Sequence, residues 1–281
     1  MSLLTLKDLT VSFNTDAGRV SSIPPAFGAP APMRDGAAPP APPQHDYPER
    51  QHHDTNRHMS LLTLQDLTVS FNTDAGRFRA ADRVSFDIRP GEMLGLVGES
   101  GCGKTVTAQS LVRLLPMPPA GIDSGSALFK GRDLLRLPIA ELRRIRGREI
   151  SMIFQDPMTA LSPLHRLGDQ LSETLRLHQP LGRKAAWRLG EEWLAKVGIP
   201  DPRERMRSWP FQCSGGQRQR VMIAMALMNE PDLILADEPT TALDVTIRAQ
   251  IFELMLAMKG RQTSILLITH DMGVVWELCE R

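Results

Sequence analysis

Several features that mark particular classes of protein are scarce or absent in this sequence. Only three cysteines occur, at the widely spaced positions Cys102, Cys213 and Cys279, which fits neither a disulfide framework nor a zinc site and favours a reducing compartment. No apolar run approaches the roughly 18 residues of a membrane helix, and the N-terminus lacks the pattern of a signal peptide. The net charge of +1 gives no chain-wide attraction for nucleic acid. We therefore expect a cytoplasmic protein that reaches a membrane only through a partner.

Two local concentrations of basic residues and histidines have a plain interpretation. The arginines between residues 143 and 148 have no aromatic residues among them and lie next to Glu141 and Glu149, so a solvated face is favoured over a nucleic-acid site. The histidines between residues 45 and 58 stand in a polar stretch. Since a metal site needs a fold that fixes its ligands, we interpret them as part of a solvated tail.

The chain begins with a repeated segment. Residues 1–19 recur as residues 59–77, with Lys7 replaced by Gln65. Between the copies, residues 21–58 are rich in proline and alanine and nearly lack large apolar side chains, so this stretch cannot offset its ordering entropy. We predict a duplicated start and a disordered linker over residues 1–58, and a functional domain over residues 59–281.

From Met59 onward the pattern is that of an α/β fold. Short apolar runs without polar alternation predict strands buried on both faces, at 93–97, 150–154, 233–236 and 264–268. Apolar residues at helical spacing predict helices, at 104–115, 167–177, 183–197 and 215–228. The mostly helical stretch 157–228 between two strands predicts a smaller helical lobe on a parallel-sheet core.

A phosphate-binding loop is the first motif. The stretch Gly98-Glu99-Ser100-Gly101-Cys102-Gly103-Lys104-Thr105 matches G-x-x-x-x-G-K-[ST]. The predicted strand before it and helix after it provide the context that the motif requires, which argues against a chance glycine-rich turn. Backbone N–H groups and a helix N-terminus would bind phosphate. Lys104 would contact the β- and γ-phosphates of ATP, and the Thr105 hydroxyl would bind Mg²⁺.

Polar residues at other strand ends supply a candidate hydrolytic site. Asp237 and Glu238 end an apolar strand; we predict that Asp237 holds Mg²⁺ and that Glu238 orients or deprotonates the attacking water. Gln155 follows another strand and suits a weak ligand of Mg²⁺ or water. His270 follows the last strand, where an imidazole could donate to the γ-phosphate. His165 and His178 have no such context.

A second anion site is predicted far along the chain. Ser214, Gly215, Gly216 and Gln217 open a predicted helix, whose N-terminal N–H groups would attract phosphate. One ATP needs only one loop of this kind. We therefore predict that this helix contacts ATP held by another subunit, in a head-to-tail dimer.

Together these motifs resemble those of the ABC-transporter ATPases. The resemblance rests on the phosphate-binding loop, Gln155, Ser-Gly-Gly-Gln, Ile-Leu-Ala-Asp-Glu-Pro, the Ala-Leu-Asp step that ends at Asp244, and Thr-His. Longer stretches around the same residues are similar to the peptide/nickel branch, which includes dipeptide, oligopeptide, glutathione and microcin importers. The resemblance covers Leu61–Arg281. It implies a P-loop NTPase fold with a parallel-sheet core, an N-terminal antiparallel β part and an inserted helical lobe.

The resemblance also implies a role and partners. A member of this family would bind ATP and Mg²⁺ and energise uptake of peptides or a related small solute. It would pair with a second ATPase subunit, identical or paralogous, and Asp244 would belong to its nucleotide-binding set. Two permeases would dock near Gln155 and the helical lobe. They would hold the chain on the cytoplasmic face of the inner membrane. An extracytoplasmic binding protein would deliver solute to them. An aromatic residue would stack on adenine; Phe71 is the candidate and Phe78 the alternate.

Three departures from the family pattern leave an alternative open. Cys213 stands where the signature usually begins with leucine, the first strand has a second copy, and the chain stops soon after His270. We therefore expect a domain incomplete at its C-terminus, for which a non-catalytic remnant is the alternative function. Non-transport ABC proteins that act on DNA or ribosomes are disfavoured, because no long coiled coil or basic inter-domain linker is visible.

Overall fold

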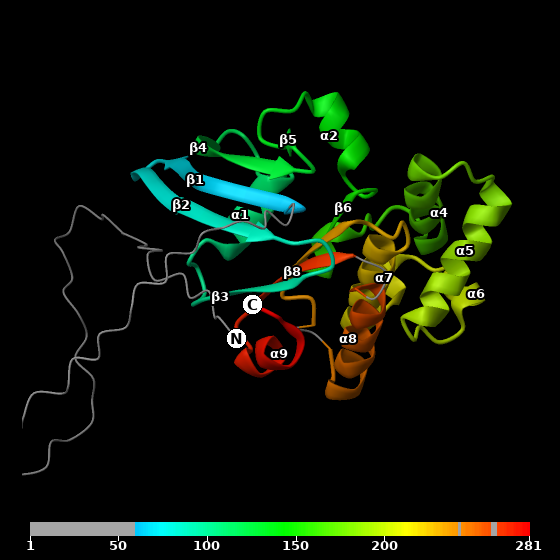
Figure 1. The fold of residues 1–281 in the computed structure, drawn as a ribbon. Coiled ribbons are helices and arrows are strands. Elements are labelled where there is room, and N and C mark those ends of the chain that lie inside the picture. The colour runs from blue at the N-terminus through cyan, green and yellow to red at the C-terminus, as the bar shows by residue number, and fades with distance from the viewer. Residues whose placement is uncertain (1–59, 241–242, 260–262) are drawn as a thin grey trace, which may run out of the picture. The chain divides into compact units, whose positions relative to one another are not determined.

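An antiparallel sheet begins the part of the chain that the structure describes. The computed structural model describes residues 60–240, 243–259 and 263–281 (Figure 1). The strand order is β2-β1-β4-β5, with bounds Leu62–Thr73 for β1, Gly76–Ile88 for β2, Ala120–Phe129 for β4 and Arg132–Asp133 for β5. The second copy of the repeat thus forms β1 and the turn into β2, whereas the first copy lies outside the described residues.

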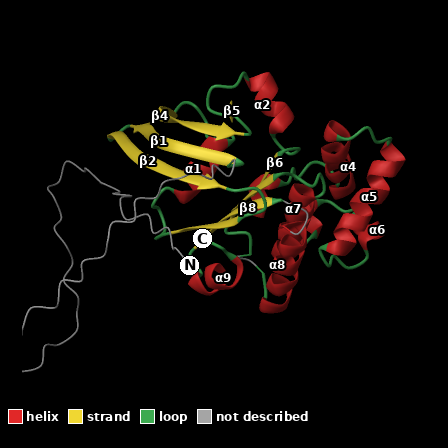
Figure 2. Cartoon of the chain, viewed as in Figure 1, coloured by secondary structure: helices red, strands yellow, loops and turns green. Residues whose placement is uncertain are grey.

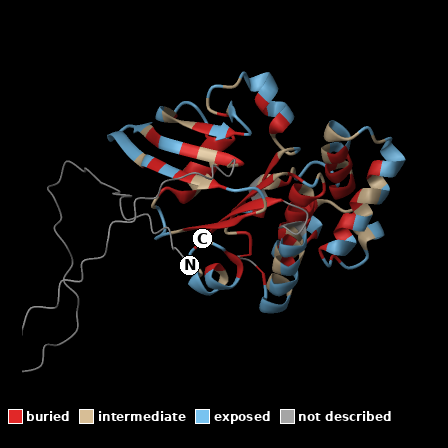
Figure 3. Ribbon diagram, in the orientation of Figure 1, coloured by how far each residue is buried: buried red, intermediate tan, exposed pale blue. Residues whose placement is uncertain are grey.

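A parallel sheet forms the centre of the domain. Its order is β3-β8-β7-β6, with bounds Met93–Val97, Ser264–Thr269, Leu233–Asp237 and Ile150–Ile153. Alternate residues face opposite sides of a strand, so Leu233 and Leu235 enter one apolar core while Ile234 and Ala236 enter the other. Both faces are therefore covered, as the unbroken apolar runs predict, and Figure 3 shows the buried residues concentrated along these strands.

Helices cover the two faces of the parallel sheet (Figure 2). Helix α1 (Lys104–Leu111) contacts β1, β2 and β7 and so lies between the two sheets. Helix α2 (Ile139–Ile145) packs in the same core. The chain between β6 and β7 is helical, and α8 and α9 follow β7 and β8. Their bounds are Pro157–Ala160 for α3, Leu167–His178 for α4, Arg183–Lys196 for α5, Pro202–Arg205 for α6, Gly215–Leu227 for α7, Val245–Lys259 for α8 and Met272–Leu278 for α9. This arrangement confirms the predicted α/β class.

Helix α1 ends four residues before the sequence pattern predicts. It stops at Leu111 although no proline occurs before Pro116. Arg113 takes the left-handed conformation with φ 49°, the N–H of Leu114 donates to the carbonyl of Gln109, and the N–H of Arg113 donates to that of Ser110. This pair of hydrogen bonds closes a helix through a left-handed residue, and the local cap rather than proline sets the boundary.

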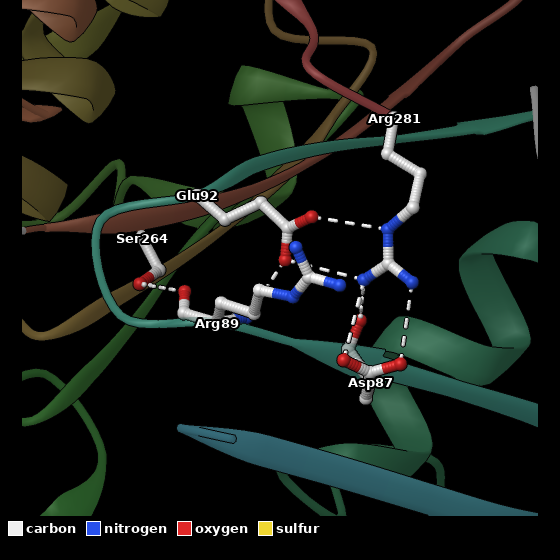
Figure 4. A network of polar contacts seen from close by, with 5 residues as sticks. All are labelled: Asp87, Arg89, Glu92, Ser264 and Arg281. Carbon is white, nitrogen blue, oxygen red and sulfur yellow. Dashed lines mark hydrogen bonds and ion pairs between the residues drawn. The ribbon is translucent and has the colours of Figure 1, made fainter. Parts of the chain in front are cut away.

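A buried ionic network fixes the turn that leads into β3 (Figure 4). The Arg281 guanidinium donates from Nε to Glu92 Oε1 at 3.0 Å and from Nη1 to Asp87 Oδ1 at 3.2 Å. The Glu92 side chain is 6% exposed, and its Oε2 accepts from the N–H of Arg89 at 2.7 Å. The Ser264 hydroxyl, from β8, donates to the Arg89 carbonyl. The network therefore ties the end of β2, the start of β3 and the start of β8 together.

The described residues contain neither a membrane-spanning helix nor a cluster of metal-ligating side chains. Within residues 60–240, 243–259 and 263–281, no helix has the length and apolarity needed to span a bilayer. The same residues hold no group of three or more His, Cys, Asp or Glu side chains arranged for a metal ion. The histidines between residues 45 and 58 fall outside this part of the chain.

Candidate functional site

The predicted site residues follow the carboxyl ends of all four parallel strands. The loop of residues 98–103 follows β3, Gln155 follows β6, Glu238 follows β7, and His270 follows β8. In parallel α/β sheets the carboxyl edge is where ligands bind, because the loops leaving the strands meet there. The topology therefore gathers residues far apart in the sequence along one edge of one sheet.

Glycine is required at specific positions of the loop after β3. Gly101 and Gly103 have φ values of 84° and 91°, a region that residues with a Cβ rarely adopt. A Cβ on Gly98 would meet the Cys102 Sγ at 2.7 Å. Side chains at these positions would therefore strain or crowd the loop, and residues 98–101 are exposed to solvent.

Lys104 begins α1 with its ammonium group folded over the loop. Its Nζ donates to the carbonyls of Gly98 at 2.8 Å and Glu99 at 2.7 Å, and the residue is 7% exposed. The first turn of α1 contains no acidic residue, so nothing there offsets the positive end of the helix dipole. The result is a backbone concavity with a fixed cation, which has the chemistry of an anion site.

Asp237 is a buried carboxylate beside this loop. The residue is 1% exposed, and burial raises the pKa of its carboxyl group, an effect that a hydrogen bond from Thr105 opposes in part. Among the described residues, its Oδ1 has no hydrogen-bond partner. An unpaired carboxylate oxygen next to a threonine hydroxyl is an all-oxygen donor set of the kind that Mg²⁺ prefers. The residues present therefore fit a magnesium ion.

Gln155, Glu238 and His270 are brought into direct contact. Gln155 Nε2 donates to Glu238 Oε2 at 3.2 Å, and His270 Nδ1 lies 3.1 Å from Glu238 Oε1. Glu238 also has a φ of 46°, which is uncommon for a residue with a side chain and is found at functional sites where the surroundings enforce it. Its side chain is 16% exposed, whereas that of His270 is 64% exposed. One carboxylate is thus held from both sides at the rim of a cavity of about 150 Å³.

The second predicted anion site lies at the N-terminus of α7. Ser214 Oγ accepts from the N–H of Gln217 at 3.2 Å, and the Gln217 side chain accepts from the N–H of Ser214 at 3.1 Å. This capping box leaves other N–H groups of the first turn open, and Ser214 and Gly215 are exposed. Cys213, just before it, is buried in the apolar core, and this burial raises its thiol pKa. It serves there as a small apolar side chain.

The remaining predicted residues are placed as follows. Phe71 and Phe78 face each other across β1 and β2, with ring centroids 5.4 Å apart and an angle of 13° between the planes. The candidate and its alternate thus form a single aromatic surface. Asp244 precedes α8, and its Oδ1 accepts from the N–H of Ile247 at 3.0 Å, so it also stabilises that helix N-terminus.

Sequence reasoning missed one polar link between α7 and the candidate site. Gln219 is fully buried, and its Nε2 donates to the carbonyl of Pro239 at 2.6 Å. Pro239 directly follows Glu238, so the helix that begins at Ser214 is tied to the loop that carries the central carboxylate. The sequence signal for this link was the amide of Gln219, which stands just before the apolar run Val221–Leu227. A buried amide needs hydrogen-bond partners.

The chain has detectable similarity to known proteins. A family model described as "ABC transporter" matches residues 81–241, more than half of the chain. The chain is 54% identical over 222 residues to the dipeptide transport ATP-binding protein DppD of Bacillus subtilis, covering 79% of this chain and 66% of that protein. It is 50% identical over 222 residues to the oligopeptide transport ATP-binding protein OppD of the same organism, covering 79% of this chain and 62% of that protein.

A solved structure is also similar. The dimeric ATP-binding cassette MJ0796, in a post-hydrolysis state bound to ADP and Pi, superimposes with a TM-score of 0.69 at 27% identity, over 76% of this chain and 89% of that one. The curated relatives are longer than this chain, which spans 66% of DppD and 62% of OppD. The fold, the motif order and the family match agree with one another. The chain belongs to the ABC transporter family of ATP-binding proteins.

Proposed function

We propose that this chain is the ATP-hydrolysing subunit of an ABC importer that energises uptake of peptides or a related small solute through partner permeases. The observation that supports it most is the contact of Gln155 and His270 with Glu238 at the sheet edge that also carries the phosphate-binding loop. The names of the relatives, dipeptide and oligopeptide transport ATP-binding proteins, support the solute class.

In this proposal the loop after β3 binds the phosphates of ATP. The N–H groups at the start of α1 would point at phosphate oxygens, and Lys104 would exchange its carbonyl partners for the β- and γ-phosphates. Thr105 and Asp237 would hold Mg²⁺, with Gln155 as a further oxygen donor. The ion would supply charge neutralisation on the phosphates. The stacked pair Phe71 and Phe78 would provide the surface for adenine.

Glu238 would act on the attacking water. A carboxylate that receives hydrogen bonds from two sides keeps one orientation, so it can accept a proton from water in a defined direction. Gln155 and His270 supply those contacts through Oε2 and Oε1. Because His270 is largely exposed, its ring would also be free to donate to the γ-phosphate.

A second ATPase subunit would complete the site. The N-terminus of α7 is exposed at Ser214 and Gly215 and has no acidic residue in its first turn. It would contact ATP held by the other subunit in a head-to-tail dimer. The similar cassette MJ0796 is dimeric with ADP and Pi bound, which supports this arrangement.

A permease would dock on an apolar hollow between the parallel sheet and the helices that lie between β6 and β7 in the sequence. The hollow has a volume of about 230 Å³. Its lining includes Leu114 after α1, Phe154 after β6, Thr174 of α4 and Met225 of α7. Because Phe154 adjoins Gln155, an apolar helix bound here would lie next to the hydrolytic site. The chain would then sit on the cytoplasmic face of the inner membrane.

Nucleotide-dependent stabilisation tests the proposal. A ligand that binds only the folded state raises its stability by about 2.7 kcal/mol at a hundredfold excess over Kd, so Mg²⁺ with ATP should raise the Tm. Lys104→Ala should abolish this shift. Lys196→Ala, which removes an exposed ammonium group that contacts Trp193, should retain it. No shift in the unmodified protein would contradict the proposal and favour a non-catalytic remnant.

A further inference from the structure

A basic hollow, lined by none of the residues assigned above, lies among the helices between β6 and β7. It has a volume of about 920 Å³ and is formed by the first half of α5 together with α6 and the residues after it. Helices α5 and α6 contact each other and lie at the right of Figure 1. Its cationic side chains are Arg183, Lys184, Arg188, Arg203 and Arg207. Within the described part of the chain, Glu191 is the one acidic side chain in its lining.

Most of this charge is not neutralised within the described part of the chain. Arg183 lies 3.8 Å from Asp169, and Arg188 lies 3.5 Å from Glu192; these are exposed pairs of the kind that contribute little. Lys184, Arg203 and Arg207 have no carboxylate within ion-pair distance among the described residues, and all are exposed. Since the whole chain has a net charge of only +1, this is a local excess that complements an anionic partner.

An aromatic side chain and an apolar one accompany the cations. Trp187 is half-buried in the hollow, and its ring packs on the backbone of α4: a Cβ on Gly168 would meet the ring at 2.5 Å. Leu177, in the last turn of α4, is 71% exposed and stands six residues before Arg183. Tryptophan, leucine and clustered basic residues together are typical of surfaces that rest on a bilayer interface.

The position of the hollow agrees with a membrane-facing surface. Thr174 of α4 lines the apolar hollow that we assign to the permease, and Arg183, which begins α5, lines the basic one. The two hollows therefore involve the consecutive helices α4 and α5, which contact each other. A permease bound at the first would bring the second toward the bilayer. This step depends on the function proposed above.

We infer that the basic hollow of α5 and α6 binds the phosphate headgroups of anionic lipids in the membrane that carries the permease. Cationic residues near an anionic bilayer each add about five-fold to its affinity. A nucleic-acid partner is less favoured because, among the residues that the structure describes, Trp187 is the only aromatic side chain in the lining. Single strands bind through several stacking aromatics.

Vesicle sedimentation of the full chain tests the inference. Binding is measured without nucleotide or permease, to vesicles of equal parts phosphatidylglycerol and phosphatidylcholine and to vesicles of phosphatidylcholine alone, at low and high salt. We expect binding to the anionic vesicles only, weakened by salt. The double variant Arg203→Gln/Arg207→Gln should lose about 25-fold in affinity, five-fold for each cation.

The matched control is Arg143→Gln/Arg144→Gln on α2, which removes the same charge from an exposed surface. It should change vesicle affinity less than two-fold. Equal binding to neutral vesicles, or an equal loss in both double variants, would overturn the inference. The inference would also be overturned if the chain bound a labelled single-stranded oligonucleotide through the same arginines, and did so more tightly per phosphate than it bound the anionic vesicles.

A cooperative thermal transition without nucleotide, measured on the same variants, shows whether they remain folded. Because the vesicle assay contains no nucleotide, its result stands whichever way the test of ATP binding turns out.

Discussion

His270 Nδ1 lies 3.1 Å from Oε1 of Glu238, whose other oxygen accepts from the Gln155 side chain at 3.2 Å. These residues follow β8, β7 and β6, which are neighbours in the sheet. These contacts place a hydrogen-bonding side chain on each side of Glu238, the carboxylate proposed as the base. Their separation along the chain makes this a product of the fold rather than of local sequence.

Removing the imidazole should slow hydrolysis without preventing nucleotide binding. We predict that His270→Ala lowers kcat for ATP by about 10²-fold or more, the usual effect of losing one positioned hydrogen-bonding group in a site. The Tm shift with Mg²⁺ and ATP should persist. His165→Ala, which removes an imidazole that contacts Ser162, is the control. A comparable loss of kcat in both variants would show that the effect is not specific to the Glu238 contact.

Replacing Asp237 should stabilise the nucleotide-free protein while removing its response to Mg²⁺. Burial raises the pKa of this carboxyl group in the folded state, so ionised Asp237 disfavours folding at pH values above that raised pKa. As the pH falls toward the unfolded value of about 3.9, the folded state takes up a proton first and the penalty disappears.

Asp237→Asn should therefore raise the Tm at pH 7 to 8, by an amount that shrinks as the pH falls through the raised pKa. Thermal melts from pH 8 down toward the unfolded pKa of about 3.9, with and without Mg²⁺ and ATP, check the prediction. A variant that is less stable at pH 8, or a gain that grows on acidification, would be inconsistent with a desolvated carboxylate.

Thiol labelling should distinguish the cysteines. Cys213 and Cys279 are 4% and 5% exposed, whereas Cys102 is half-buried in the exposed loop. Since accessible thiolates react faster, an aromatic disulfide reagent should modify one thiol quickly in the native protein. That fast phase should vanish in Cys102→Ala and slow down when Mg²⁺ and ATP are bound. Three equal phases would mean that Cys213 is not buried as described.

Loss of Arg281 should destabilise the domain. Its side chain is 18% exposed and pairs with Glu92, which is 6% exposed, so its removal leaves a buried carboxylate without its partner. We predict that Arg281→Met lowers the free energy of unfolding by about 3 kcal/mol, measured by urea denaturation. Arg136→Met removes an arginine whose side chain is 79% exposed and which lies 3.4 Å from Asp133, and it should cost less than about 1 kcal/mol. Equal effects would refute the buried character of the network.

Much of the central sheet could be predicted from sequence, for a physical reason. Strands buried on both faces carry continuous apolar runs, so β3 was predicted with its observed bounds and β7 and β8 to within one residue. The antiparallel strand β4 carries no such signal. It contains Gly121, Gly125 and several polar residues, and it is a strand because Leu62 of β1 pairs with Phe129. Tertiary pairing decides such a segment.

The candidate site was predictable residue by residue but not as an arrangement. The glycine pattern predicts the phosphate-binding loop because positive φ values at Gly101 and Gly103 are local properties. The hydrogen bonds of Glu238 with Gln155 and His270, and that of Gln219 with Pro239, depend on which strands and helices become neighbours. A single sequence does not show which strands and helices will pack next to one another.

Steady-state ATP hydrolysis by the unmodified chain and by Glu238→Gln is the most direct measurement. The central claim is that Glu238 acts as the base on water bound beside the phosphate-binding loop. It predicts Mg²⁺-dependent hydrolysis that falls by at least about 10²-fold in the variant, with the Tm shift on ATP binding retained. Glu253→Gln, an exposed carboxylate on α8, should leave the rate unchanged. Hydrolysis at the same rate in Glu238→Gln as in the unmodified chain would contradict the account.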